Sequence, residues 1–360
     1  MKAISLFSGA GGMDIGMISA GFSVNLANEI DQTACKTYIQ NHKSTLLIEG
    51  DLDKNLDKFN NLSGIDLVFG GPPCQGFSVA GKMDIHDPRS KLVFSFLEVV
   101  KRVLPKAFIM ENVKALGSLD KFSGIRQEIA NQASQMGYRV SLIQLNAKDF
   151  GVPQSRERIF FIGLKNDMEV TLEDFKKYYK EAPSIREAIA HLGKAGSESN
   201  PHITNAKITL AKNPVLRKSA YAGMLFNGQG RPLNPDSWSS TLPASMGGNR
   251  TPIIDESHLY HHEQSWVEKY HELLISGQYT ANIEVSKSLR RLTIDEAKII
   301  QTFPKNYIFC GTQSKVFTQI GNAVPCKLAE IVGLVVKNKI ADQLYKKHEK
   351  NQNELYLEKV

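Results

Sequence analysis

The sequence predicts an α/β fold, a doubly wound and mostly parallel sheet joined to a smaller, irregular domain. Residues 1–165 alternate short strand-like runs with helix-length segments. Glycine-rich turns follow several of these runs, and the periodicity fades after about Lys180. Strands that are separated by helix-length crossovers are typical of a parallel sheet covered on both faces. Such sheets bind ligands at the carboxyl ends of their strands.

The first strand is expected at residues 3–7, and a glycine turn and a helix at 13–20 follow it. The second strand is expected at 24–29 and a helix at 31–41, with Asp31 as its N-cap. The later strands of this part are predicted at 66–69, 107–110, 139–145 and 159–164, with helices at 91–103 and 125–136.

The rest of the chain is less regular. Residues 196–201 form a turn cluster of Gly, Ser, Asn and Pro. Helical patterns return at 263–276 and at 294–301, where Thr293 is the expected N-cap. The last apolar helix is predicted at 327–336, and the charged residues after it are expected to be its frayed, exposed extension.

Composition limits the classes of protein that the chain can belong to. With 360 residues, 42% hydrophobic and 22% charged, it predicts about two globular domains and excludes a fibrous or disordered protein. Its four cysteines are widely spaced, which favours free thiols over a disulfide scaffold or a zinc site. No apolar run approaches the roughly 18 residues of a membrane span, and the start lacks a secretory pattern. We therefore expect a cytoplasmic protein without membrane contact.

The positive charge of the chain is concentrated in one region. The formal net charge is +7, and residues 201–253 contain six basic residues but one acidic residue, Asp236. This stretch is also rich in Asn, Gly, Pro and Ser and includes Tyr221 and Trp238. Such a region predicts a polyanion-binding surface that can reach base edges. The alternative is an ordinary solvated loop region.

The glycine loop after the first strand is a candidate nucleotide site. Its sequence is FSGAGG, and the dinucleotide pattern G-x-G-x-x-G fails because Asp14 occupies the third glycine position. This departure favours a ligand without a pyrophosphate, although the loop is also compatible with a plain tight turn. Glu29 is placed to accept hydrogen bonds from ribose hydroxyls, and Asp51 to bind an adenine amino group. Taken singly, either carboxylate is more often a helix cap or a surface charge.

The most distinctive segment is GGPPCQGFS at residues 70–78, after an apolar strand. Two glycines and two prolines predict a rigid loop that presents Cys74 at the end of the strand. A lone cysteine is by default a small buried hydrophobic residue. Here its position favours a nucleophile, which needs a cationic or amide-rich setting to ionise.

Two further clusters supply partners for such a nucleophile. Glu111 closes a strand at the same expected edge of the sheet, where a carboxyl group can exchange protons with a ligand. Arg156 and Arg158 precede the strand at 159–164, and at strand spacing they are expected to project to one face and bind an anion or a carbonyl oxygen. The alternative for all three is a structural salt bridge.

On these residues the chain resembles the DNA (cytosine-5) methyltransferases, in particular the compact bacterial type II restriction–modification methylases. The motifs that carry the resemblance occur in family order over residues 7–325: FSGAGG, NEID, EGD, GGPPCQGFS, ENV, QSRER, Arg291-Leu292-Thr293 and Gly321-Asn322-Ala323-Val324-Pro325. The resemblance implies the Rossmann-like fold of S-adenosylmethionine-dependent methyltransferases. It implies S-adenosylmethionine as methyl donor, S-adenosylhomocysteine as product and no metal.

The resemblance also implies a role for each matching residue. Cys74 would be the nucleophile, and Glu111 would bind the amine and nitrogen 3 of cytosine. Arg158 would hold the ring carbonyl, and Arg156 would help to order the catalytic loop and a phosphate. Asp87 and Arg89 would steady the loop 76–88. The residues implied to line the donor site are Phe7, Gly9, Gly11, Gly12, Glu29, Ile30, Asp51, Pro73 and Asn322.

The same resemblance divides the chain by function. Residues 1–185 and 318–345 would form the catalytic domain and residues 186–317 the target-recognition domain, whose variable part is about 196–288, before a charged tail at 346–360. The residues expected to contact DNA are Ser78, Arg89, Arg231, Thr241, Asn249 and Arg250, and Asn227 and Gln229 are further candidates for base contacts. The expected partner is double-stranded DNA, with a restriction endonuclease as a functional partner, and we expect a monomer.

Three alternatives remain open at this point. The nearest is a cytosine-5 methyltransferase that acts on transfer RNA, although that branch has a smaller recognition region. The second is a DNA-binding module that keeps a donor site without catalysis. The third is a nicotinamide oxidoreductase, which Asp14 disfavours.

Overall fold

The computed structural model describes residues 1–73, 91–277 and 283–357, and the side chains as far as residue 342. The chain divides into two compact units. The sheet unit comprises Met1–Asn146, Glu157–Tyr179 and the chain from Cys326 onward, and the second unit comprises Ala147–Arg156 and Lys180–Pro325. These boundaries differ by a few residues from those expected at 185/186 and 317/318, and they also assign the segment Ala147–Arg156 to the second unit.

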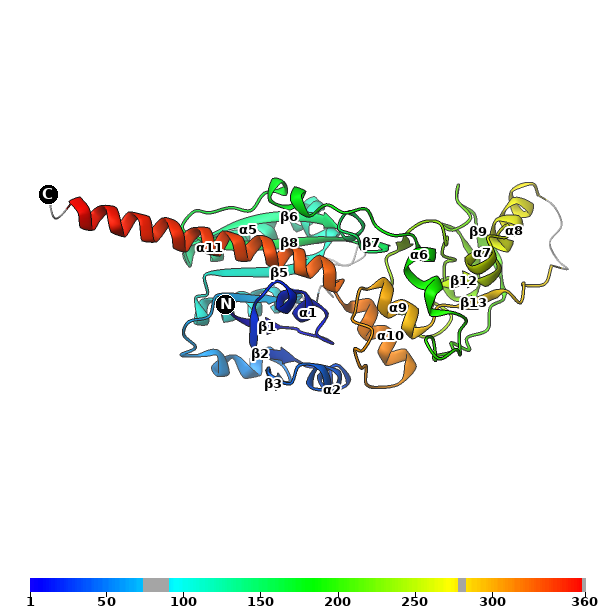
Figure 1. The fold of residues 1–360 in the computed structure, drawn as a ribbon, viewed down its shortest axis with the longest axis horizontal. Helices are drawn as coiled ribbons and strands as arrows, with labels where there is room; N and C mark the ends of the chain where they lie inside the picture. Colours follow the sequence, from blue (N-terminus) through cyan, green and yellow to red (C-terminus); the bar gives the residue numbers. More distant parts are fainter. Residues whose placement is uncertain (74–90, 278–282, 358–360) are drawn as a thin grey trace. The chain divides into compact units, whose positions relative to one another are not determined.

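The sheet unit contains a seven-stranded, mostly parallel sheet in the order β3-β2-β1-β4-β5-β8-β6 (Figure 1). Its strands are β1 (Lys2–Leu6), β2 (Ser23–Glu29), β3 (Leu46–Glu49), β4 (Leu67–Gly70), β5 (Ala107–Val113), β6 (Tyr138–Asn146) and β8 (Glu157–Lys165). Only β8 runs antiparallel to its neighbours β5 and β6. The predicted doubly wound α/β fold is confirmed.

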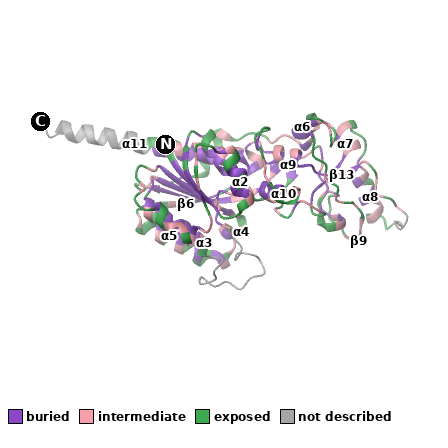
Figure 2. Ribbon diagram, turned by 90° about the horizontal axis from the view of Figure 1, so that it is seen from below, coloured by how far each residue is buried: buried purple, intermediate pink, exposed green. Residues whose placement is uncertain are grey.

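Helices cover both faces of this sheet. The helices of the unit are α1 (Gly12–Ser19), α2 (Gln32–Asn41), α3 (Lys91–Val103), α4 (Lys114–Ser118), α5 (Ser123–Gln135) and α11 (Cys326–Leu357). On one face, side chains of α3 and α5 pack on strand residues such as Ile4 and Phe108 in a fully buried core. On the other face, α1 reaches the sheet where Ser5 donates a hydrogen bond to Asp14. Figure 2 shows the strands as almost continuously buried, as a sheet covered on both faces requires.

Helix α11 departs from the expected frayed tail, because it continues as helix to Leu357. The Lys337 side chain donates to the carbonyl oxygen of Ala20, and Lys339 pairs with Asp174 at 2.7 Å. These contacts, together with the buried Ile340, extend the ordered helix beyond the predicted end. Within the described residues, Gln313–Asp342 is apolar and long enough to cross a membrane by length and composition alone, but 72% of its most apolar window is buried in the protein. Burial of this kind is typical of a core helix.

The second unit consists of short elements around two apolar cores. Its strands are β7 (Gln154–Ser155), β9 (Leu210–Val215), β10 (Met224–Phe226), β11 (Ser239–Ser240), β12 (Ile253–Asp255) and β13 (Leu289–Arg291). Its helices are α6 (Ile185–Ile189), α7 (Glu256–His261), α8 (Trp266–Ile275), α9 (Ile294–Ile300) and α10 (Gln313–Asn322). Thr293 caps α9 as predicted, since its side chain accepts the Glu296 N–H. The short strands had no periodicity strong enough to be predicted.

Candidate active site and DNA interface

Four of the predicted site segments lie at the carboxyl ends of adjacent strands in the sheet unit. Strands β2, β1, β4 and β5 are neighbours, and the chain leaves them near Glu29, Phe7, Gly71 and Glu111. From β1 the chain goes to β2 on one side, while β4 lies on the other side. This edge is therefore a topological switch point, where open α/β sheets form their ligand crevice.

The carboxylate of Glu29 holds the loop that follows β1. Its Oε2 accepts the Gly9 N–H at 2.7 Å, and its Oε1 accepts the N–H groups of Ile30 and Asp31 at 2.9 and 2.8 Å. Burial raises the pKa of Glu29, and the three amide donors oppose that rise. A carboxylate has about four acceptor positions, so it retains capacity for one ligand hydroxyl. In the same loop, Phe7 has a left-handed φ of 53°, which is uncommon outside glycine.

Two further residues of the predicted donor site flank this arrangement. The Ile30 side chain is 63% exposed beside the buried carboxylate, which leaves an apolar surface for a flat ring. Asp51 caps the 3₁₀ helix Leu52–Phe59, with its Oδ1 accepting the Asp53 N–H at 3.0 Å. The helix-cap alternative thus holds for Asp51, and its contact with adenine stays a prediction.

Asp14, which sequence reasoning used only to reject a dinucleotide site, is a fully buried carboxyl group. It accepts hydrogen bonds from Tyr38 Oη at 2.7 Å and from Ser5 Oγ at 3.0 Å. Burial raises its pKa to about 7 despite these donors. An acid in the first turn of a helix ordinarily faces solvent and favours the helix dipole. The sequence therefore contained no signal for this buried position.

The start of the Cys74 loop is fixed by close packing. A Cβ on Gly70 would lie 2.1 Å from the carbonyl oxygen of Leu6, and a Cβ on Gly71 would lie 3.0 Å from Glu111 Oε2. Asn112, which is 2% exposed, donates from Nδ2 to the carbonyl oxygen of Pro72 at 3.2 Å. Asn112 therefore anchors the loop that leads to the predicted nucleophile, a role that the sequence reading did not assign. Three predicted site residues, Cys74, Ser78 and Arg89, lie outside the described residues, as does Asp87.

Glu111 and Arg158 form an ion pair across β5 and β8, with 2.8 Å between Glu111 Oε1 and Arg158 Nε. The antiparallel register places Arg158 opposite Val113, so the two side chains meet diagonally on one face of the sheet. They are 13% and 15% exposed, respectively, so water reaches both groups only partly. The pair presents a carboxylate and a guanidinium together at the end of β5. That is a suitable donor and acceptor set for a pyrimidine edge.

Arg156 and Arg158 contact different groups among the described residues, and their projection to a common face stays a prediction. Arg158 belongs to β8 and contacts Glu111, whereas Arg156 precedes β8 in the second unit and is 2% exposed. Its guanidinium donates to the carbonyl oxygens of Leu242 at 3.2 Å and Gly321 at 3.0 Å. The difference arises because the strand is interrupted between β7 and β8. The implied role of Arg156 toward the catalytic loop stays a prediction.

The basic region of the second unit surrounds a cleft of about 680 Å³. Arg231 and Arg250 line it, with the aromatic side chains of Tyr221 and Trp238 and the predicted DNA contact Thr241. Neither arginine has a side-chain hydrogen bond or ion pair among the residues that the structure describes. Cationic, aromatic and hydroxyl groups around one opening are the composition of a nucleic-acid interface.

Not every candidate in this region faces the cleft. Asn227 uses its amide internally, because Nδ2 donates to the Lys207 carbonyl oxygen and Oδ1 accepts from Thr209 N–H and Arg291. Asn227 therefore has a structural role here, and its contact with a base stays a prediction. Gln229 does line the cleft, while Asn249 does not. Asn322 is an exposed residue at the end of α10, in the second unit, and its contact with the donor stays a prediction.

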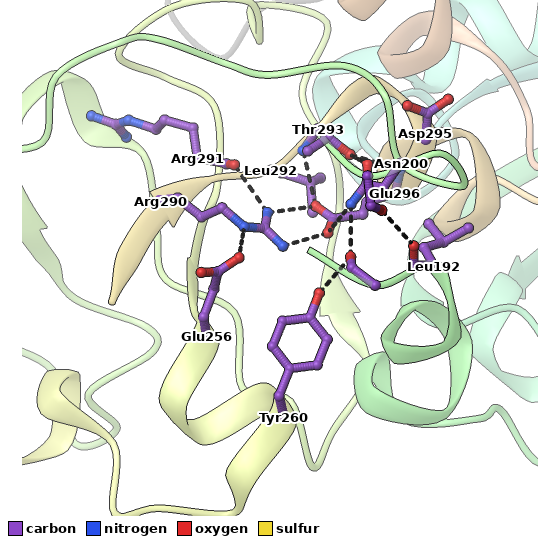
Figure 3. A network of polar contacts seen from close by, with 12 residues as sticks. Leu192, Asn200, Glu256, Tyr260, Arg290, Arg291, Leu292, Thr293, Asp295 and Glu296 are labelled. Carbon is purple, nitrogen blue, oxygen red and sulfur yellow. Dashed lines mark hydrogen bonds and ion pairs between the residues drawn. The ribbon is translucent and has the colours of Figure 1, made fainter. Parts of the chain in front are cut away.

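A buried polar network supports the second unit, and sequence reasoning missed it (Figure 3). Arg290 forms a two-point ion pair with Glu296, at 2.6 and 2.9 Å, and binds Glu256 through Nε at 2.7 Å. Asn200 joins the network by accepting from Thr293 Oγ1 and donating to Glu296. Arg291, the next residue, points away from this pair and contacts another set of partners. The one signal in the sequence for these contacts was the Arg-Leu-Thr motif at 291–293, which includes Thr293.

A mostly parallel sheet with a topological switch point, together with a cationic cleft in a second unit, is typical of a nucleotide-binding fold that acts on nucleic acid. The family model of the C-5 cytosine-specific DNA methylases matches residues 1–338. The chain belongs to that family. It is a DNA cytosine-5 methyltransferase of the restriction–modification type, which implies S-adenosylmethionine as donor and double-stranded DNA as substrate.

Known proteins are similar over nearly the whole length. Type II methyltransferase M1.HphI of Haemophilus parahaemolyticus is 36% identical over 340 residues, which cover 92% of this chain and 86% of the relative. Type II methyltransferase M.FnuDI of Fusobacterium nucleatum is 32% identical over 363 residues, covering 99% of this chain and all of the relative. The solved S. pombe Dnmt2 methyltransferase is 20% identical with a TM-score of 0.66, covers 94% of this chain and 98% of its own, and supports the fold alone. The family match removes the oxidoreductase alternative.

Proposed function

We propose that the protein methylates carbon 5 of a cytosine that is flipped out of double-stranded DNA, through a covalent adduct with Cys74. The observation that carries this proposal is the Glu111–Arg158 ion pair at the end of β5, in the same unit as the Glu29-held loop and the Gly71 turn. A carboxylate and a guanidinium beside the start of the Cys74 loop match the chemistry that cytosine activation needs. Carbon 5 of cytosine is otherwise a poor nucleophile.

The residues at the switch point fit S-adenosylmethionine. Glu29 retains acceptor capacity for a ribose hydroxyl, and Ile30 offers an exposed apolar surface for adenine. In the loop between Phe7 and Gly12, a Cβ on Gly9 would meet no atom within 4 Å, so we assign this open space to the amino acid part. A donor without a pyrophosphate agrees with Asp14 in place of the third glycine. When bound, S-adenosylmethionine supplies an electrophilic methyl group on its sulfonium sulfur. Gly9, Gly11, Asp51, Pro73 and Asn322 complete the proposed lining.

The proposed chemistry is carried by three side chains. The Cys74 thiolate adds to carbon 6 of cytosine, and Glu111 hydrogen-bonds the amine and holds the proton at nitrogen 3. Arg158 binds the ring carbonyl and offsets the negative charge that develops on the ring. Carbon 5 would then be nucleophilic and form a bond to the donor's methyl carbon, while the broken carbon–sulfur bond leaves its electron pair on S-adenosylhomocysteine. The proton on carbon 5 would pass to water, the Cys74–carbon 6 bond would break with its electron pair returning to the thiolate, and the nitrogen 3 proton would return to Glu111. These steps would release 5-methylcytosine and free enzyme.

A cytosine inside a duplex cannot reach such a pocket, so the base must be flipped out at a cost of a few kcal/mol. Contacts from the cationic cleft in the second unit would offset this cost and select the sequence. Arg231, Thr241 and Arg250 are the described residues that we assign to this role, with Asn249 nearby in the chain. We further propose that the enzyme acts as a cytoplasmic monomer and protects host DNA against a cognate restriction endonuclease.

The test is bisulfite sequencing of plasmid DNA from cells that express the protein, beside a Cys74→Ser variant. We expect full conversion resistance at one short motif with the natural chain and none with the variant. The variant should still bind the donor and DNA, because serine replaces the thiol without removing the binding residues. Methylation by the variant would exclude the adduct. Methylation by neither protein, together with label transfer to total RNA, would favour an RNA substrate.

A further inference from the structure

Arg291 is a buried arginine whose guanidinium donates hydrogen bonds to oxygen atoms of three separate chain segments. It is 1% exposed. Its Nη1 donates to the Thr251 carbonyl oxygen at 2.9 Å, and its Nη2 donates to Asn227 Oδ1 at 2.9 Å. Longer contacts, of 3.4–3.5 Å, reach the carbonyl oxygens of Ala206, Lys207 and Asn227. No carboxylate pairs with it among the described residues, in contrast to the neighbouring Arg290.

The segments that Arg291 holds are those that carry the exposed groups of the cleft. Gln229 and Arg231 follow Asn227, and Arg250 precedes Thr251. All three side chains line the cleft and are exposed. The guanidinium thus lies behind two cleft-lining loops, residues 227–231 and 247–251, and binds the backbone of both.

Close packing limits the freedom of these two loops. A Cβ on Gly230 would lie 2.2 Å from Arg291 Nη1 and 2.5 Å from the Thr251 carbonyl oxygen. The Ile253 N–H donates to the Arg231 carbonyl oxygen at 3.0 Å, which joins the ends of the loops. Gln229 is held at a left-handed φ of 66°, a conformation that persists when the surroundings determine it. The backbone of the two loops is therefore one fixed body.

Arginine suits this position because its planar group offers five donors in fixed directions. Burial lowers its pKa to about 10, so it remains protonated at neutral pH. A lysine would keep the charge but could not bind the two loops and Asn227 with the same geometry. An apolar residue would leave buried carbonyl oxygens without donors, which is costly.

We propose that Arg291 is a positioning residue for sequence recognition, fixing the spacing between the base-reading side chains Arg231 and Arg250. The inference rests on the proposed DNA-reading role of the cleft. It predicts that Arg231 and Arg250 each read one base pair of the target site. Weakening the hydrogen bonds of Arg291 should lower the discrimination at both base pairs together.

The experiment uses the full-length enzyme and a DNA library in which each base pair of the methylated site is varied in turn. Arg231→Ala and Arg250→Ala first identify the base pair that each arginine reads, as the position where discrimination falls. Arg291→Lys is then compared with Arg126→Lys. Arg126 is a matched control, because it also binds two carbonyl oxygens, those of Leu116 and Leu119, but in the sheet unit.

We expect Arg291→Lys to lose at least about tenfold discrimination at both of these positions and at no other. Its kcat at saturating cognate DNA should stay within about twofold of the natural enzyme, as should donor affinity. Arg126→Lys should change thermal stability without altering discrimination. An equal loss of activity for all DNA sequences would overturn the proposal, because a merely structural residue would produce it. A loss of discrimination at only one of the two base pairs would overturn it as well.

Hydrogen–deuterium exchange of the free protein separates this inference from the proposed function. Arg291→Lys should increase exchange together in residues 206–209, 225–231 and 249–253, and Arg126→Lys should not. If the natural enzyme methylates no DNA, the proposed function fails, while hydrogen–deuterium exchange still tests whether Arg291 holds the two loops together. Faster exchange in only one of the three segments would refute this positioning role.

Discussion

The candidate active site of the sheet unit and the cleft of the second unit differ in how their charged side chains are bound. In the sheet unit, Glu29 is bound by three backbone amides, Asp14 by two hydroxyl groups and Glu111 by Arg158. In the cleft of the second unit, Arg231 and Arg250 are exposed. Preorganised groups stabilise charge that develops during a reaction, whereas exposed cations can adapt to a phosphate or a base edge. The contrast separates the place where chemistry is proposed from the place where sequence is read.

Breaking the Glu111–Arg158 ion pair of the sheet unit should have the largest effect on activity. We expect Glu111→Gln to reduce kcat by about 10²–10⁴-fold, because the amide cannot hold the proton at nitrogen 3 and leaves Arg158 without its carboxylate. Single-turnover methylation of a cognate duplex measures this change. Donor affinity, measured by calorimetry, should remain near that of the natural enzyme.

Glu157→Gln is the matched control. Glu157, beside Arg158 on β8, pairs with Lys114 of α4 at 2.9 Å, but both side chains are 40% exposed or more. Exposed pairs contribute about 0–1 kcal/mol, so kcat and stability should hardly move. An equal loss of kcat in Glu111→Gln and Glu157→Gln would show that these carboxylates only stabilise the fold, which would contradict the proposed role of Glu111.

The buried Asp14 should produce an intermediate effect, visible as a pH dependence of stability. Its folded pKa of about 7 lies above the ordinary 3.8, so the folded protein keeps a proton that the unfolded chain releases. The free energy of unfolding should therefore fall as the pH rises from about 4 to about 7, by at most roughly 4 kcal/mol. Asp14→Asn should remove this slope, as urea midpoints over that pH range would show.

Asp174→Asn provides a control of opposite sign. Although burial opposes it, the contact with Lys339 lowers the pKa of Asp174. Its contribution is present above the ordinary pKa and is lost as the pH falls through the folded pKa. A slope between pH 4 and 7 that survives in Asp14→Asn would mean that another group causes it.

The smallest effect is expected in the open cleft. Arg231→Ala should cost about 1–3 kcal/mol of discrimination at one base pair, with little change in kcat at saturating DNA. Competition between cognate and singly substituted duplexes measures it. Lys212→Ala, an exposed cation outside the cleft lining, should leave discrimination unchanged. A uniform loss for all sequences with a reduced salt dependence would instead assign Arg231 to a phosphate.

Much of the sheet unit could be predicted because local patterns decide it. The strand and helix alternation, the N-cap Asp31, and the arrival of Glu29, Gly71 and Glu111 at one edge follow from short segments and the parallel topology. Motif order alone identified the family. In the second unit, the helices near 263–276 and 294–301 and the N-cap Thr293 were predicted. Its strands were not, because strands of two to six residues carry too little periodicity.

The sequence by itself determined the fold class and the family, and it predicted the residues proposed for the chemistry, since each depends on residue type at fixed local spacing. Only the tertiary structure decided which partners each charged side chain binds. Arg156 and Arg158 are two residues apart, yet Arg156 binds carbonyl oxygens 86 and 165 residues away, while Arg158 pairs with Glu111. Likewise, the amide oxygen of Asn227 accepts a hydrogen bond from Arg291, which lies 64 positions later. Partners so distant are set by packing of the whole unit, which no local pattern encodes.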